Sequence, residues 1–342
     1  MNVPLKIALL AATMIAASAT AKQSVPTIAV QKTEEGQSVS FDGYTWQRRE
    51  LAKRLPLNEP WPSEAVIEAQ FKRFGLDHPA LPADLPVPAR VLQDVYIVNS
   101  KPNLTYLIDG GPGNLVIVDP GFTSNVESIL HNVEALGFSR KDIKWVINTH
   151  AHFDHSMADA AFQRLGAQIL VGRDDVGAVE KGTAVTAKYA LPADAVAHYP
   201  TLHVDHAIDD GEELVLGNKT FLAIRTPGHT GGSTCFMLMI GGKTVLFGGD
   251  TILYDYRLGD QRSPFADNVA YLASLKKLMR VGAYRGGWDV LLPGHGTIVL
   301  DRAYGDVLKG ERQVQLDVDN GDPVAALPFE TDAYRALMFG RP

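Results

Sequence analysis

Four potential metal ligands stand within six consecutive residues, directly after an apolar run. Residues 143–149 predict a strand, and the residues that follow it are His150, Ala151, His152, Phe153, Asp154 and His155. Alternate residues leaving a strand project the same way, so His150 and His152 could share one ion while Asp154 and His155 turn toward another. Imidazole and carboxylate groups at this density suit zinc or another first-row divalent metal. The chain is therefore expected to fold around a metal centre at the end of a strand.

Three further candidate ligands stand in turns that each follow an apolar strand candidate. His229 follows Pro227 and Gly228, Asp250 follows two glycines, and His295 stands between two glycines. Glycine and proline in such turns let a backbone approach a crowded centre. Together with the first cluster, the candidate metal ligands are His150, His152, Asp154, His155, His229, Asp250 and His295. Asp119, after an earlier strand candidate, is expected to brace the loop that carries the ligands.

The order of these residues resembles the metallo-β-lactamase fold superfamily. The resemblance rests on the motif from Thr149 to His155, followed in order by His229, Asp250 and His295, and it covers roughly residues 91–315. It implies an α/β fold of the αβ/βα type, which is a four-layer sandwich of two packed mixed sheets with helices outside. It also implies a two-metal site at the edge of the sheets.

Carried over by position, the resemblance assigns His150, His152 and His229 to one metal, and Asp154, His155 and His295 to the other. Asp250 matches the acidic position that bridges both metals in the glyoxalase II and lactonase branches. Two Zn²⁺ per chain are expected, with iron or manganese left open. Two divalent ions roughly 3.5–4 Å apart can share a hydroxide, polarise a carbonyl and receive a departing anion. Asp154 is expected to orient that hydroxide.

The branch within the superfamily is left open by two sets of residues. Residues 136–144, 164–167 and 256–260 look like subclass B3 metallo-β-lactamases, whereas 248–251 and 293–296 look like glyoxalase II-type hydrolases and lactonases. In B3 enzymes a serine typically follows the aspartate, which is not counted as a metal ligand. Asp250 is therefore either a bridging ligand, the interpretation we favour, or a group outside the ligand shell.

These residues predict an exported dinuclear zinc hydrolase that uses a metal-bound hydroxide to open a cyclic amide or ester, with β-lactams as the first substrates to test. The alternatives are a lactonase or glyoxalase II-type thioesterase and an iron redox enzyme of the same fold. Tyr254, Tyr256 and Arg257 follow the Asp250 turn and are candidate contacts for a small-molecule substrate. The oligomeric state is not predicted.

The N-terminus reads as a cleaved secretory signal, because Lys6 precedes an apolar stretch and a cleavage site ending at Ala21. The protein is therefore expected to be secreted or periplasmic. No later segment is apolar for 18 residues, which argues against stable membrane insertion. The formal net charge of −7 argues against a nucleic-acid partner. The single cysteine, Cys235, excludes an intramolecular disulfide and is expected to be a packing residue.

Composition and periodicity divide the chain into four parts: residues 1–21 as signal peptide, 22–90 as a proline-rich extension that packs on the main domain, 91–316 as the metallo-β-lactamase-like domain and 317–342 as a C-terminal tail. One helix, over 63–74, is expected in the extension. In the main domain we expect helices over 125–136, 157–165, 268–280 and 304–315. Strands are expected over 95–98, 104–108, 115–118, 143–148, 169–171, 214–216, 220–225, 234–240, 244–247 and 290–292.

Overall fold

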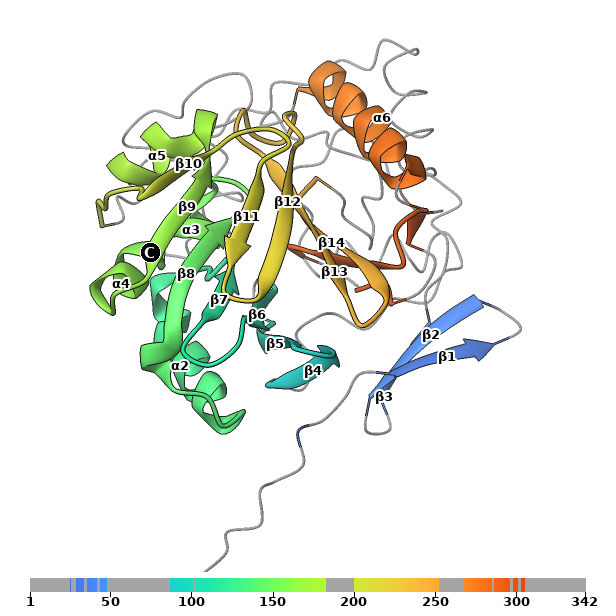
Figure 1. Ribbon diagram of the computed structural model, residues 1–342, viewed down its shortest axis with the longest axis horizontal. Coiled ribbons are helices and arrows are strands. Elements are labelled where there is room, and N and C mark those ends of the chain that lie inside the picture. Colours follow the sequence, from blue (N-terminus) through green and yellow to red (C-terminus); the bar gives the residue numbers. More distant parts are fainter. Residues whose placement is uncertain are drawn as a thin grey trace, which may run out of the picture.

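Two β-sheets pack face to face and carry helices on their outer faces (Figure 1). The computed structural model describes residues 25, 29–33, 36–41, 44–47, 87–100, 103–182, 200–251, 267–284, 286–295, 298–300 and 303–304. The four layers follow the order helix, sheet, sheet, helix, so the expected α/β sandwich is confirmed.

The first sheet has seven strands in the spatial order β10-β9-β8-β7-β6-β5-β4. Their bounds are β4 Ala89–Leu92, β5 Val95–Asn99, β6 Thr105–Asp109, β7 Leu115–Val118, β8 Ile143–Asn148, β9 Gln168–Gly172 and β10 His206–Ile208. Strands β4 to β7 form an antiparallel meander, whereas β7 to β10 run parallel. Parallel neighbours need crossover connections, and these place helices on the outer face of the sheet.

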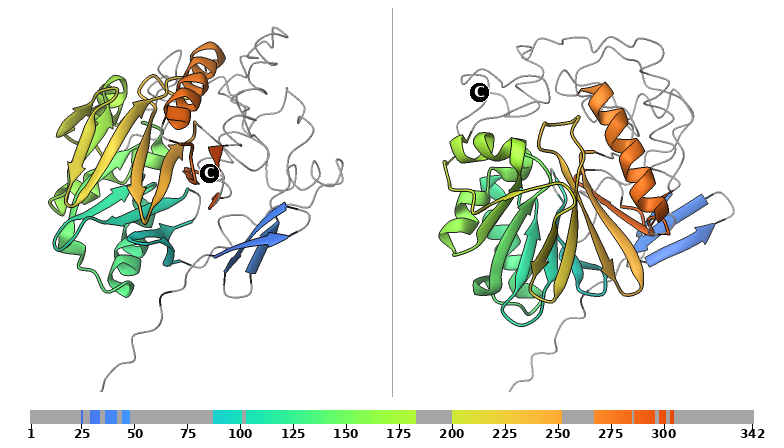
Figure 2. Two further views of the ribbon diagram at one scale, coloured as in Figure 1. Left: turned by 45° about the vertical axis from the view of Figure 1, so that its right-hand side comes forward. Right: turned by 45° about the horizontal axis from the view of Figure 1, so that its top comes forward.

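The second sheet has five strands in the order β11-β12-β13-β14-β15. Their bounds are β11 Glu213–Leu216, β12 Lys219–Arg225, β13 Thr234–Ile240, β14 Lys243–Gly249 and β15 Val290–Pro293. Neighbours are antiparallel except β14 and β15, which are parallel. Helix α6, Asn268–Tyr284, lies against this sheet (Figure 2). It buries Tyr271, Leu272, Leu275 and Leu278 against Cys235, Met237 and Leu246.

The outer face of the first sheet is covered by α2 Val126–Ala135, α4 Asp159–Arg164 and α5 Val176–Lys181. Helix α2 buries Val126, Ile129, Leu130 and Val133, which recur at the spacing of one helix face. It ends before Gly137, whose φ of 87° is the left-handed conformation that often terminates a helix. Short 3-10 turns, η2 Thr123–Asn125, η3 Arg140–Asp142 and η4 Arg173–Asp175, and the single-turn helix α3 Phe153–Ser156 complete this half.

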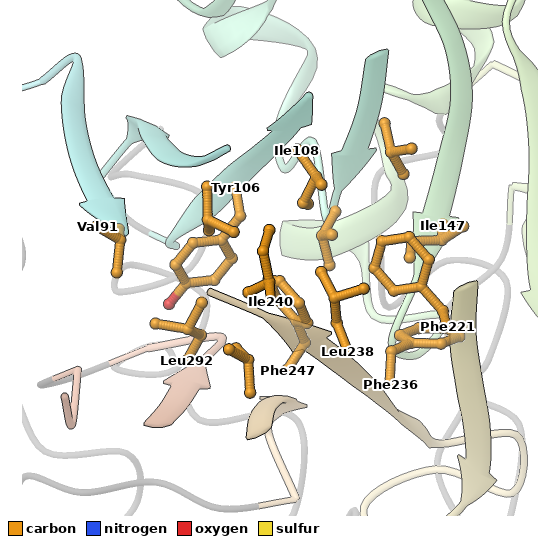
Figure 3. Packing of buried hydrophobic residues seen from close by; sticks show 14 of the residues in the cluster. Val91, Tyr106, Ile108, Ile147, Phe221, Phe236, Leu238, Ile240, Phe247 and Leu292 are labelled. Atoms are coloured by element: carbon orange, nitrogen blue, oxygen red, sulfur yellow. The ribbon is translucent and has the colours of Figure 1, made fainter. Parts of the chain in front are cut away.

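The central core lies between the two sheets. Figure 3 shows Tyr106, Ile108 and Ile147 of the first sheet facing Phe221, Phe236 and Phe247 of the second. The rings of Tyr106 and Phe247 meet edge to face, with centroids 5.6 Å apart. Fully burying one such side chain contributes roughly 1.5–3 kcal/mol to folding. This core fixes the two sheets relative to each other and so fixes the loops at their edges.

The described strands and helices of the main domain match the expected ones closely, with a few differences. The helix expected over 157–165 begins only at Asp159, because residues 153–156 form the separate turn α3. Strands β4 and β10 and helix α5 were not predicted. Because β4 begins at Ala89, the main sheet starts two residues before the expected boundary at 91.

The expected extension contains a small antiparallel sheet, β1 Ala29–Thr33, β2 Gly36–Phe41 and β3 Tyr44–Gln47, where only a helix had been predicted. That helix, over 63–74, lies outside the described residues, as do the signal segment 1–21, residues 305–315 and the tail 317–342. The four-part division therefore stays a prediction. Among the described residues, no helix is long and apolar enough to cross a membrane.

Candidate metal centre

The seven candidate ligands converge at one edge of the two sheets. The histidine motif follows β8, His229 lies between β12 and β13, Asp250 follows β14, and His295 follows β15. Within each of three overlapping groups, the potential ligand atoms lie within 4.8 Å of one another. The first group is His150, His152 and His229, the second is Asp154, His155 and His295, and the third, His150, His155 and Asp250, shares a histidine with each of the other two.

The first group consists of three buried imidazoles. Nε2 of His150 lies 3.1 Å from Nδ1 of His152, and the ring of His229 lies 4.4 Å from that of His152, centroid to centroid. Burial, followed by the nearby His229, lowers the pKa of His152 to about 3. Burial and the neighbouring His155 hold the pKa of His150 well below its usual range. Both rings are therefore neutral near pH 7, which is the form that binds metals.

The second group combines imidazoles with a carboxylate. Nε2 of His295 lies 3.0 Å from Oδ2 of Asp154 and 3.1 Å from Nε2 of His155. Although burial favours the neutral ring, Asp250, Asp154 and Asp119 together raise the pKa of His155 to about 10. Carboxylate oxygens of Asp119, Asp154 and Asp250 lie within 3.7 Å of the ring nitrogens of His155, and this negative charge favours a cation at this group.

Asp250 lies between the two groups. Its Oδ1 is 3.4 Å from Nε2 of His155, and its Oδ2 is 3.3 Å from Nε2 of His229 and 3.6 Å from Nε2 of His295. Burial alone would raise the pKa of this carboxyl, but His295 and His155 hold it well below its usual range. An anionic carboxylate therefore faces histidines of both groups.

Asp119 holds the ligand-bearing loop through three hydrogen bonds. Its Oδ1 accepts the backbone N–H of Thr149 at 2.8 Å, and its Oδ2 accepts the Thr149 hydroxyl at 2.6 Å and Nδ1 of His155 at 3.0 Å. The Thr149 oxygen also lies 3.1 Å from Nδ1 of His150. These contacts occupy Nδ1 of His150 and Nδ1 of His155. In each ring Nε2 therefore remains available to face the other candidate ligands.

The donor set fits divalent cations. Five imidazoles and two carboxylates, gathered in a buried site, are the ligand types that zinc takes in hydrolytic enzymes. Two pairs of ring nitrogens lie 3.1 Å apart: one pair joins His150 to His152, and the other joins His155 to His295. A cation bound between the two nitrogens of a pair would stabilise this arrangement. Asp154 and His295, with side chains 14% and 16% exposed, form the open side of the site.

The candidate substrate contacts Tyr254, Tyr256 and Arg257 lie outside the described residues. Asp175 was not singled out from the sequence. Its buried carboxylate accepts hydrogen bonds from residues next to three of the candidate ligands. It stands in a charged run, Arg173-Asp174-Asp175, which reads in the sequence as an exposed turn.

Comparisons with known proteins concern the family and the fold of the chain. A family model described as the metallo-beta-lactamase superfamily matches residues 100–308. A probable metallo-hydrolase of Methanocaldococcus jannaschii is 31% identical over 195 residues, which are 57% of this chain and 87% of that protein. A hydroxyacylglutathione hydrolase of Maricaulis maris is 28% identical, over 44% of this chain and 48% of its own length.

Among solved structures, a subclass B3 metallo-β-lactamase of Bradyrhizobium japonicum superposes with a TM-score of 0.52. The two chains are 24% identical, and the match covers 67% of this chain and 90% of the other. At this identity the likeness concerns the fold, and it agrees with the four-layer arrangement described above.

Proposed function

This chain belongs to the metallo-β-lactamase superfamily of metal-dependent hydrolases, and we propose that it is a dinuclear zinc enzyme that opens a cyclic amide or ester. β-Lactams are the first substrates to test. Metal dependence and hydrolysis come with the family, whereas the number of zinc ions and the bond that is cleaved belong to the proposal.

The observation that carries the proposal is the position of Asp250 between two groups of ligands. One of its oxygens faces His155 at 3.4 Å and the other faces His229 at 3.3 Å. A single buried carboxylate that reaches histidines of both groups supports a pair of cations in preference to one. Bound there, two zinc ions would make water nucleophilic near pH 7 and would polarise a carbonyl oxygen.

Among the described residues, Asp154 is the one best placed to hold the attacking water. Burial would raise the pKa of its carboxyl, but His155 and His295 keep it well below its usual range, so the group is anionic at neutral pH. Its side chain is on the open side of the site, where it can accept a hydrogen bond from water beside the substrate. Asp154 would thereby orient the nucleophile toward the carbonyl.

No side-chain nucleophile is required. Cys235 is fully buried in β13, and its sulfur contacts Thr226 and the carbonyl of Gly248, so it does not open onto the site. Covalent catalysis would need an activated thiol or hydroxyl beside a base. The proposed mechanism is therefore direct attack by water.

The proposal is tested on purified protein that has been loaded with zinc and screened in parallel against penicillins, carbapenems, acyl-homoserine lactones and thioesters. We expect two zinc ions per chain, loss of hydrolysis on extensive dialysis against EDTA, and recovery on adding zinc. Undiminished hydrolysis after complete metal removal would overturn the proposal. Iron in the protein as isolated, with oxygen uptake, would replace it with the redox alternative.

A second candidate, a lactonase or glyoxalase II-type thioesterase, is favoured by the same position of Asp250, which resembles the bridging acidic group of those branches. The relative from Maricaulis maris is named a hydroxyacylglutathione hydrolase, and a relative from Gallus gallus is named an acyl-coenzyme A thioesterase; the matches cover about half of each of these proteins. In the screen, cleavage of thioesters or lactones with inert β-lactams would select this candidate.

We also propose that the protein is exported, on the strength of the basic and apolar residues before Ala21. In a bacterial host, the mature chain should be recovered from the periplasmic or secreted fraction with an N-terminus at Lys22. Full-length chain retained in the cytosol would contradict export without affecting the proposed chemistry.

A further inference from the structure

Asp175 is a buried acidic residue that directs its carboxylate toward the metal-ligand loops. It closes the turn η4 at the N-cap position of α5, and it is 1% exposed. An aspartate at this position ordinarily accepts a hydrogen bond from its own helix. Here the side chain makes no such bond. Its carboxylate oxygens instead accept hydrogen bonds from other segments of the chain.

Its three hydrogen-bond donors come from two loops of the metal centre. Oδ2 accepts the backbone N–H of Ala151 at 2.9 Å and the hydroxyl of Thr230 at 2.6 Å. Oδ1 accepts the backbone N–H of Gly232 at 2.8 Å. Ala151 stands between His150 and His152, and Thr230 follows His229 directly. One carboxylate therefore joins the two loops that supply all three imidazoles of the first group.

The two loops belong to different sheets, one following β8 and the other joining β12 to β13. Backbone packing holds Asp175 at their junction. A Cβ at position 232 would lie 2.5 Å from Cγ of Asp175, and a Cβ at position 172 would lie 2.0 Å from the carbonyl oxygen of Gly232. Only glycines allow this approach, so the carboxylate meets the His229 loop at a fixed position.

We infer that Asp175 is a positioning residue that sets the spacing between the His150–His152 segment and His229, and thereby the cation affinity of that group. This inference rests on the proposed function, in which the group binds zinc. Asp119 performs the corresponding task for His155 through its 3.0 Å contact. Asp119 and Asp175 are thus two buried carboxylates outside the ligand set, and of the two only Asp119 also reaches the group that contains His155.

The test is a titration of the metal-free full chain with Co²⁺, which reports each binding site through its d–d absorption and through competition with a chelator. Asp175→Asn keeps the size of the side chain but replaces one acceptor with a donor. We expect one of the two Co²⁺ equivalents to bind about 10- to 100-fold more weakly, as is usual when a group that orients ligands is lost. The other equivalent should change by less than about twofold.

The weakened equivalent is identified by combining variants. In a His229→Ala background, Asp175→Asn should cause no further loss at that equivalent, because both changes act on the same group. The neighbouring Asp174 does not serve as a matched control. Because Arg225, the ion-pair partner of Asp174, also donates to the carbonyl of Gly231 in the His229 loop, the clean control is Asp209→Asn. It removes the exposed ion pair between Asp209 and Arg173 of η4, neither of which belongs to a ligand loop, and it should leave both equivalents unchanged.

If Asp175→Asn does not fold, Thr230→Val removes the hydroxyl that donates to Asp175 and that also lies 2.8 Å from Oγ of Ser233. It should weaken the same equivalent by a smaller factor. Unchanged binding of both equivalents in these variants would overturn the inference and leave the proposed function intact. Equal weakening of both, together with a lower melting temperature, would show a purely structural role and overturn it as well. Absence of Co²⁺ binding in the unsubstituted protein would refute the proposed function itself.

Discussion

Nδ1 of His155 lies 3.0 Å from Oδ2 of Asp119, and both side chains are buried. The same oxygen accepts the hydroxyl of Thr149, whose oxygen lies 3.1 Å from Nδ1 of His150. Asp119 therefore acts on one histidine of each ligand group, directly in one case and through a hydroxyl in the other. This arrangement distinguishes it from Asp175, whose contacts reach only the first group.

Asp119→Asn should weaken both metal equivalents, by about 10- to 100-fold at the group that contains His155. The amide supplies one acceptor where the carboxylate supplies two, so the three donors of Thr149 and His155 can no longer all be satisfied. Chelator competition with Co²⁺ measures the effect. Glu127→Gln, on the exposed face of α2, is the control and should leave both affinities unchanged. Unaltered affinities in the Asp119 variant would refute the role given to Asp119.

Asp250→Asn should lower occupancy at both metals together. Its two oxygens face His155 and His229, members of different groups, and the amide nitrogen cannot bind a cation. Metal analysis after gel filtration should give a clear deficit from two ions per chain, with a fall in kcat of at least about tenfold. Full occupancy at both sites would place Asp250 outside the ligand shell, as in the B3-like interpretation.

Cys235 should be inert in the native protein. Burial raises the pKa of its thiol to about 11, so roughly a thousandth of it is ionised at pH 8. Iodoacetamide should label the thiol only after denaturation, and catalysis should survive the treatment. Mass spectrometry of the labelled protein provides the measurement. Stoichiometric labelling of native protein with loss of activity would contradict direct attack by water.

Long apolar strands were predictable because both of their faces are buried. Strands β13 and β14 read as nearly continuous apolar runs, and the structure places them in the middle of the second sheet. Strand β10 has only three residues and begins with the exposed His206, so its identity depends on pairing with β9. Helix α5 has six residues with Gly177 in its first turn, which leaves too little periodicity to detect.

The candidate ligands were predictable for a different reason, since histidine and aspartate in glycine-rich turns after strands have few structural uses. The residues that position them carry no such signal. Asp175 lies 24 residues from Ala151 and 57 from Gly232, and only the packing of the two sheets brings these together. Sequence patterns report the local periodicity of an element, whereas contacts of this kind arise from how the elements pack.

Asp159 is fully buried at the start of α4, where its carboxyl contacts the side-chain amide of Asn148. Burial, opposed by that amide and reinforced by the charge of Asp119, raises its pKa well above the usual range. The folded state therefore keeps this proton to a higher pH than the unfolded chain. Its contribution to stability is complete below the unfolded pKa and is lost as pH rises toward the folded pKa.

Asp159→Asn is neutral throughout, so the melting temperature of the variant minus that of the unsubstituted protein should increase from pH 4.5 to pH 8, measured on metal-free protein. A difference that stays constant across this range would mean that Asp159 is ionised in the folded state.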